Sequence, residues 1–266
     1  MKKLIPHLLL PVLALVLIAI TASAQDANEI MKKSHLAYYY AGNDGLAEVT
    51  MTLTDKRGKE RVREFTMLRR DESDGGNQEY YTYFKKPSDV SRLTFMVHKM
   101  TDGNDLRWLY VPSVDLVKPI SADDKNSSFV GSDFTYEDVS GRRWTEDNHT
   151  YKGEQDLNGT AVYVIESVPK EPYKGFARKV SYIDKDNFLP LKEEYYDSKN
   201  NLERIFTAEK VDTVDGIPTV TIRKMDNVQK KSFTTVDFTS IKYNVGIEAD
   251  VFSERYLKTP PRKYIH

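Results

Sequence analysis

Cysteine is absent from the 266-residue sequence, and histidine occurs only five times. Without thiols the chain has no disulfides, no thiolate metal site and no cysteine nucleophile. It also lacks the cysteine that carries the anchor of a bacterial lipoprotein. The histidines that follow the N-terminal segment lack the paired spacing typical of metal ligands: His35, His98, His149 and His266. We therefore expect no metal site, no lipid anchor, and a stability that comes from a packed core.

The sequence also lacks a block of like charge and the common catalytic motifs. Its 39 basic and 40 acidic residues are interspersed, which argues against a nucleic-acid ligand. No Gly-x-Ser-x-Gly elbow, His-Glu-x-x-His pair, phosphate loop or dinucleotide fingerprint is present. We therefore expect no catalytic residues, no cofactor and no enzyme activity.

One long apolar run is present, at the N-terminus. A positive head, Met1–Lys3, precedes an apolar core over Leu8–Ile20 and a small-residue cleavage site at Thr21–Ala24. This core of 13 residues is shorter than the roughly 20 that a membrane span needs. We expect residues 1–24 to be an export signal, so that the protein works outside the cytoplasm. Residues 25–266 are then expected to form one soluble domain.

A single helix is predicted to open that domain. Asp26 and Glu29 have the spacing of a capping box, and Gly42 marks the end. Between them, small and apolar residues recur at helical spacing: Ala27, Ile30, Met31, Ser34, Ala37, Tyr38 and Ala41. This pattern gives one face suited to lying against a sheet.

Almost all of the remaining chain predicts strands, and 17 tyrosines and 11 phenylalanines suit half-buried sheet faces. Strands are expected at Leu46–Thr54, Arg61–Arg70, Arg92–Met100, Leu106–Val111, Ile217–Met225 and Lys231–Ile241. Between them, Phe176, Val180 and Tyr182 alternate with Lys179 and Ser181, and Leu189, Leu191 and Tyr195 alternate with Lys192 and Glu194. Alternation indicates an antiparallel meander with one wet and one buried face. Strands of about ten residues tend to curl, which predicts a barrel or half-barrel.

A polar insertion over Ser121–Gly141 interrupts the strands and contains the run FVGSDFTYED. Gly131 allows a sharp turn, and Ser132 or Asp133 is predicted to cap a short helix that carries Phe134 inward. Such a segment, placed across the open end of a curved sheet, would act as a lid. Its carboxylates could share a cation, but acidic residues at a helix start also suit the helix dipole, so no metal is assigned.

Four stretches resemble the LolA-like outer-membrane lipoprotein-sorting proteins: Trp108–Pro112, Phe129–Asp138, Phe188–Lys192 and Phe252–Leu257. The family motif falls on Gly131, Ser132, Asp133, Phe134, Tyr136, Glu137 and Asp138. The resemblance implies an incomplete, strongly curved antiparallel β-barrel with an N-terminal helix and a short helical lid covering an apolar cavity. It also implies a periplasmic, monomeric carrier for the acyl chains of a lipoprotein or another lipid. A membrane exporter of the resistance-nodulation-division type is the implied partner.

The residues predicted to line the lipid cavity are Phe95, Met96, Trp108, Tyr110, Phe129, Phe134 and Tyr136. Two other functions fit the sequence. One is an accessory protein of such an exporter that binds no lipid itself. The other is a lipid-active hydrolase, which would need Ser132 or Asp133 to meet His98 or His149 in a concave site.

Overall fold

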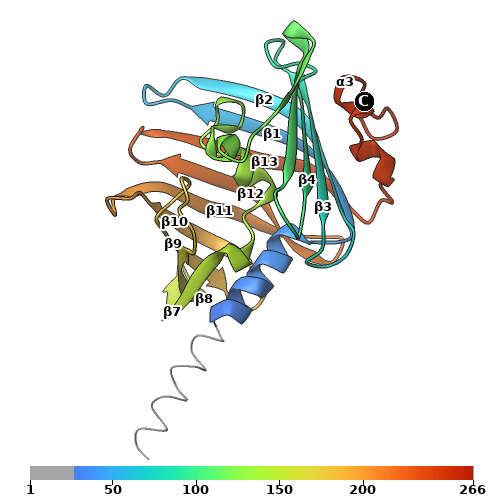
Figure 1. Cartoon of the computed structure of the whole chain (residues 1–266). Coiled ribbons are helices and arrows are strands. Elements are labelled where there is room, and N and C mark those ends of the chain that lie inside the picture. The colour runs from blue at the N-terminus through green and yellow to red at the C-terminus, as the bar shows by residue number, and fades with distance from the viewer. Residues whose placement is uncertain (1–26, 266) are drawn as a thin grey trace, which may run out of the picture.

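The computed structural model of the protein describes residues 27–265 (Figure 1). The expected export signal and Asp26 of the expected capping box lie outside this range. None of the helices within it is long and apolar enough to cross a membrane.

Thirteen strands form one antiparallel sheet that curls strongly without closing. Strands that follow one another in the sequence pair with one another, except β6 and β7; in addition β1 pairs with β13, so two meanders meet at that seam. Strands β6 and β7 are the two edges. The prediction of an incomplete antiparallel barrel is therefore confirmed. The strands are β1 (Asp44–Thr54), β2 (Glu60–Asp71), β3 (Gln78–Lys86), β4 (Thr94–Lys99), β5 (Leu106–Val111), β6 (Leu116–Pro119), β7 (Asp147–Leu157), β8 (Thr160–Pro169), β9 (Arg178–Asp184), β10 (Pro190–Tyr196), β11 (Leu202–Val214), β12 (Ile217–Asn227) and β13 (Ser232–Tyr243).

The predicted N-terminal helix spans residues 27–39 and lies across the concave side of the sheet (Figure 1). Its buried Ala27, Ile30 and Met31 pack against Ile165 of β8 and Ile183 of β9. The helix therefore buries the small-to-apolar face that its sequence predicted. Two further helices are short, α2 (Tyr136–Ser140) in the inserted segment and α3 (Arg255–Lys258) near the C-terminus.

The two faces of the sheet carry separate cores. On the concave face, aromatic rings of the inserted segment, Phe129 and Phe134, join apolar residues of the strands. On the opposite face of β3–β5, the C-terminal segment packs through Phe252 and Leu257, beside Tyr81. The hydroxyl of Tyr81 donates to the carbonyl oxygen of Tyr256 at 2.7 Å. Residues of the C-terminal segment therefore cover a face of the sheet that would otherwise be exposed to solvent.

Strands β9 and β10 place charged groups on the concave face. Lys179 and Ser181 both bond to the same carboxylate oxygen of Glu193, at 2.7 and 2.9 Å, and Ser181 is fully buried. Val180 and Tyr182, which alternate with them, are only half-buried. The expectation that the apolar residues of this stretch would form its buried face was wrong for β9, because these polar groups satisfy one another inside the molecule.

Candidate functional site: a lidded interior with two cavities

The inserted segment closes over the concave face and is held there by Asp133. Its carboxylate accepts hydrogen bonds from Ser232 (2.6 Å) and Thr234 (2.9 Å) of β13, and its amide donates to the Thr234 hydroxyl at 3.0 Å. Gly131 adopts a φ of 84°, the left-handed region that favours glycine, and this turn directs Asp133 to the sheet. We call residues 121–141 the lid.

The helix of the lid is capped one turn later than the sequence indicated. Thr135 is the N-cap residue, and its hydroxyl accepts from the amide of Asp138 while the Asp138 carboxylate accepts from the amide of Thr135. The prediction that Ser132 or Asp133 caps this helix was wrong, because Asp133 bonds to β13 instead. Phe134 points inward as expected and is 5% exposed.

Two acidic residues of the lid helix pair with cations. Asp138 accepts a 2.6 Å hydrogen bond from the guanidinium of Arg204 on β11, and both side chains are largely buried. Glu137 pairs with Lys125 at 2.7 Å and accepts a hydrogen bond from the hydroxyl of Tyr173. The three carboxylates Asp133, Glu137 and Asp138 therefore each have their own partners. Among residues 27–265, no group of three or more histidine, aspartate or glutamate side chains could hold a metal ion.

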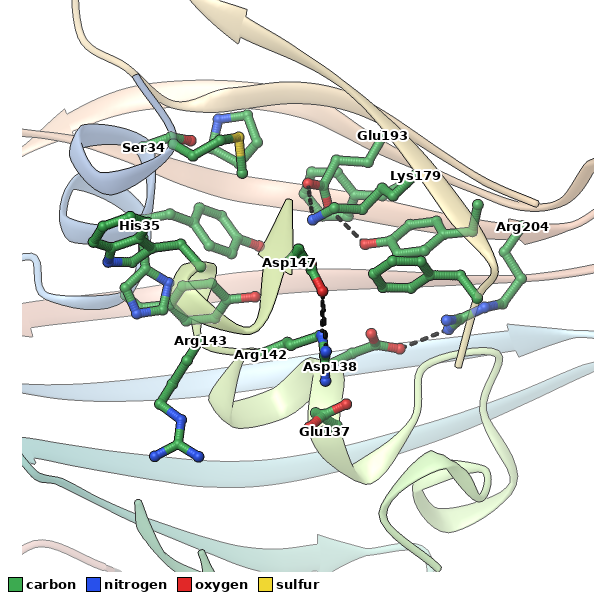
Figure 2. A pocket seen from close by; sticks show the side chains of 18 of the residues that line it. Ser34, His35, Glu137, Asp138, Arg142, Arg143, Asp147, Lys179, Glu193 and Arg204 are labelled. Atoms are coloured by element: carbon green, nitrogen blue, oxygen red, sulfur yellow. Dashed lines mark hydrogen bonds and ion pairs between the residues drawn. The ribbon is translucent and has the colours of Figure 1, made fainter. Parts of the chain in front are cut away.

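Two of the cavities in the interior are lined by residues of both the N-terminal helix and the lid. The apolar cavity, about 120 Å³, is lined chiefly by Leu46, Ala47, Met67, Val220, Phe238 and Ile241. The charged cavity, about 70 Å³, is lined by residues of the helix, of α2, of β7 and of β9–β12 (Figure 2). Tyr38, Tyr39 and Arg223 line both. Each volume is below the roughly 300–1,000 Å³ of a typical ligand pocket. Neither of these two cavities is therefore large enough, in this state, to hold a drug-sized ligand.

Most charges in the charged cavity are matched in pairs, three of which the dashed lines of Figure 2 mark. Besides Arg204 with Asp138, Arg142 pairs with Asp147 at 3.0 Å, and Lys179 pairs with Glu193 at 2.7 Å. Such buried pairs hold the lid and the strands in one arrangement more than they add stability.

Two histidines of this cavity are held neutral. Burial, with a smaller effect of Lys99 and Lys179, lowers the pKa of His35 to about 3. Burial also lowers the pKa of His149. Because the unfolded chain binds a proton at an ordinary histidine pKa of 6.5 and the folded chain does not, folding stability falls as the pH falls below 6.5.

The largest part of that pH dependence is expected from His35. Lowering the pH from 7 to 5 should cost about 2 kcal/mol of folding free energy through this residue. His35→Phe should remove this part of the slope and leave the smaller part due to His149. Urea unfolding of both proteins at several pH values measures the difference. If the free energy of unfolding changed with pH equally in the wild type and the variant, His35 would not be the source of the pH dependence.

A serine and a histidine do meet in the interior, but they are not the predicted pair. His149 Nδ1 lies 2.8 Å from Ser167 Oγ, and its Nε2 lies 2.7 Å from the carbonyl oxygen of Trp144. A carbonyl only accepts, so Nε2 carries the proton and Ser167 donates to Nδ1. Ser167 is fully buried, which keeps a substrate from its hydroxyl in this state. Ser132 instead donates to the carbonyl of Phe134.

The seven residues predicted to line the lipid cavity are divided between the two faces of the sheet. Phe95 and the lid residues Phe129, Phe134 and Tyr136 lie on the concave face, where the rings of Phe95, Phe129 and Tyr136 meet edge-to-face or tilted, with ring centres 5.1–5.6 Å apart. Phe129 and Phe134 also border a small space beside Arg223. Met96, Trp108 and Tyr110 pack instead under the C-terminal segment. For these three the expectation needs correction, because alternation along β4 and β5 turns their side chains away from the lid.

The sequence did not single out the cationic residues of the interior. Arg204 and Arg223 occupy inward positions on β11, a strand that the sequence analysis did not assign, and on β12. Near Arg223 the β11–β12 pairing shifts register, so that Val220 and Arg223, three residues apart, both line the apolar cavity. A one-residue bulge of this kind breaks the alternation that a reading of the sequence relies on.

Comparisons with known proteins agree with this architecture. A family model described as an uncharacterized protein matches residues 76–259, more than half of the chain. No curated protein matches the chain. Among solved structures, a DUF1329 family protein from Desulfovibrio piger is 26% identical, with a TM-score of 0.82 and coverage of 88% of this chain and 99% of that one.

Two further solved structures are similar. A domain described as an outer membrane lipoprotein-sorting protein from Vibrio parahaemolyticus is 28% identical, with a TM-score of 0.82 over 88% of this chain and 99% of that one. A LolA superfamily protein from Nitrosomonas europaea is 16% identical, with a TM-score of 0.68 over 86% and 98%, and shares the fold. The curled sheet, the lid and these likenesses together show that the chain has a LolA-like fold and belongs to the DUF1329-like family.

Proposed function

We propose that the protein is a non-enzymatic, periplasmic carrier that holds the acyl chains of a lipoprotein or lipid inside the curled sheet. The observation that supports this most directly is the closed lid over an interior rich in aromatic and aliphatic side chains, with an apolar cavity behind it. The likeness to a lipoprotein-sorting domain points in the same direction. The carrier is proposed to act as a monomer and to exchange its cargo with an exporter of the resistance-nodulation-division type.

The energy of lipid transfer explains why an enclosed site is needed. A two-chain lipid with about 30 methylenes costs on the order of 24 kcal/mol to expose to water, at about 0.8 kcal/mol each. A flat surface patch leaves much of that chain wet, whereas a lidded interior covers it. Release into a membrane requires the two environments to differ by only a few kcal/mol, so the lid must also open at low cost.

Polar contacts at the edge of the lid suit this requirement. Asp133 is bonded to Ser232 and Thr234, whose hydroxyls water can satisfy once the lid lifts. The aromatic residues Phe129 and Phe134 fill the space that the acyl chain would take, so the closed lid acts as a substitute for cargo. In this proposal, cargo binding exchanges one set of apolar contacts for another.

A disulfide that fixes the lid to the sheet tests the proposal. Because the protein has no native cysteine, the two introduced cysteines can pair only with each other. The amide nitrogen of Asp133 lies 3.0 Å from the Thr234 hydroxyl, which places the two residues side by side. We expect the oxidised double variant Asp133→Cys/Thr234→Cys to take up a fluorescent fatty acid at least about tenfold more weakly than its reduced form, because the locked lid cannot rise.

The reduced double variant is the matched control, since it differs only by the disulfide. Titration of the probe by fluorescence, with and without a reducing agent, measures the effect. Native mass spectrometry of the wild-type protein purified from its own cell envelope should show bound lipid. Protein that is empty there and fails to take up the fatty acid in either redox state would refute the carrier function.

A further inference from the structure

Arg223 occupies the centre of the interior. It lies on β12 and lines the apolar cavity, the charged cavity and the small space under Phe134. The residue as a whole is half-buried, and it borders each of these three spaces. Its guanidinium carbon lies 5.5 Å from the ring centre of Phe134 on the lid and 4.8 Å from that of Phe238 on β13.

This cation forms no ion pair with a described residue, and the carboxylate that attracts it at longer range, Asp138, is already bonded to Arg204. Its Nη1 donates to the hydroxyl of Tyr38 at 2.7 Å, its Nε has no hydrogen-bond partner, and no carboxylate of residues 27–265 lies within ion-pair distance. Arg63 and Arg107 also have an unpartnered Nε, but each lies within 4.0 Å of an aspartate oxygen, of Asp89 and Asp105 respectively.

Every other charged residue that lines the two cavities has an opposite charge beside it. Arg69 pairs with Asp71, Arg143 with Glu146, and the remaining members form the pairs described above. An enclosed guanidinium stays protonated, and leaving it unpaired is costly, with only aromatic rings in partial compensation. A ligand that carries negative charge would remove that cost.

The surroundings of Arg223 define what else the ligand contains. The apolar cavity extends from the guanidinium between the aliphatic side chains of β1, β12 and β13, including Leu46, Val220 and Ile241. A small hydrophilic anion would leave this space unfilled, whereas a hydrocarbon chain would fill it. Tyr38 adds a hydroxyl beside the guanidinium, and burial raises the pKa of that hydroxyl, so it remains a hydrogen-bond donor.

We propose that the interior selects an acyl chain that ends in an anionic group, a carboxylate or a phosphate, which pairs with Arg223 while the chain lies in the apolar cavity. This inference rests on the proposed carrier function and specifies its cargo. The ring of Phe134 shields the guanidinium when the lid is closed, so lifting the lid exposes the anion site and the chain site together. A neutral lipid of the same length would gain the apolar contacts and lose the ionic one.

The test compares ligands that share a chain and differ in the head group. Dodecanoate and 1-dodecanol each displace the uncharged fluorescent probe N-phenyl-1-naphthylamine from the wild-type protein and from Arg223→Gln. We expect the wild-type protein to bind dodecanoate about tenfold or more tightly than dodecanol, since a hydrogen-bonded ion pair is lost with the alcohol. In Arg223→Gln this preference should disappear while dodecanol affinity is retained.

Three controls distinguish a loss of ligand recognition from a loss of folding and from a change in net charge. Arg61→Gln, at an exposed position of β2, removes the same charge and should keep the preference for dodecanoate. Thermal melting should show Arg223→Gln to be at least as stable as the wild type, because the variant loses an unpaired buried cation. Arg223→Lys keeps the charge and should keep most of the preference even if the glutamine variant folds poorly.

Three results would overturn the proposal. If the wild-type protein bound dodecanoate and dodecanol with equal affinity, the proposed anion site would be refuted. The proposed carrier function would not be affected by that result. Inorganic phosphate that displaces the probe from the wild-type protein as strongly as dodecanoate does would assign the site to a free anion. Failure of both dodecanoate and dodecanol to displace the probe would refute this proposal through the carrier function on which it rests.

Discussion

Replacement of Asp138 by alanine is expected to lower the free energy of unfolding by about 3–5 kcal/mol. The side chain pairs with Arg204 at 2.6 Å, and the exposed fractions are 18% and 7%. Removing the carboxylate leaves the guanidinium buried without its partner, and it also removes half of the capping box of α2. Urea unfolding followed by circular dichroism measures the loss.

A double-mutant cycle separates the ion pair from the other contacts. Asp138→Asn with Arg204→Met removes both charges, so the double variant should be more stable than the sum of the two single losses predicts. The lid should also open more readily in Asp138→Ala, which predicts faster uptake of a fluorescent fatty acid. Additive losses in the cycle would show that the two side chains contribute independently, contrary to this assignment.

Turn chemistry and strand alternation were enough to predict a curled antiparallel sheet and several of its strands, although β3, β6, β7 and β11 were not assigned. The hairpin of β1 and β2 was expected within a few residues, because Asp55–Gly58 is a strong turn signal between two alternating runs. The order of the strands follows from such short connections. What closes the seam between β1 and β13 is a contact between residues about 190 apart, and no local pattern encodes it.

The lid was placed correctly as a segment, but the roles of its residues were only partly predicted. Phe134 was expected to point inward on a short helix capped by Ser132 or Asp133, and it is buried as expected. Thr135 was overlooked as the helix cap, since Ser132 and Asp133 are equally good caps by residue type. The choice between them depends on Ser232 and Thr234, which are about 100 residues away in the sequence.

The charged part of the interior could not be predicted from hydrophobic alternation. Lys179, Glu193 and Arg204 lie inward because each finds an opposite charge on another strand or on the lid. A pattern-based prediction turns such residues to solvent, since burial of a single charge is costly. The pairing that cancels the cost exists only in the folded molecule. Arg223 departs further from the pattern, as it lines the interior cavities without such a pair.

The second large effect is expected at Phe129, whose replacement by alanine should cost about 3–5 kcal/mol of folding stability. The residue is 3% exposed, and its ring centre lies 5.5–6.5 Å from those of Phe65, Phe84, Phe95 and Tyr136. Truncation leaves a void under the lid that rigid neighbouring rings cannot fill. Val114→Ala, at a position 66% exposed, is the matched control and should change stability by less than about 0.5 kcal/mol.

The affinity for a fatty acid should rise in Phe129→Ala, although the folding stability falls. If the rings of the lid occupy the space of the cargo, then Phe129→Ala destabilises the closed, empty state without removing a contact that the cargo needs. The variant should therefore bind a fatty acid more tightly than the wild type, and saturating ligand should raise its melting temperature by more. A variant that loses both stability and affinity would instead show that Phe129 contacts the acyl chain, and the lid would then be a wall of the cavity more than a substitute for its contents.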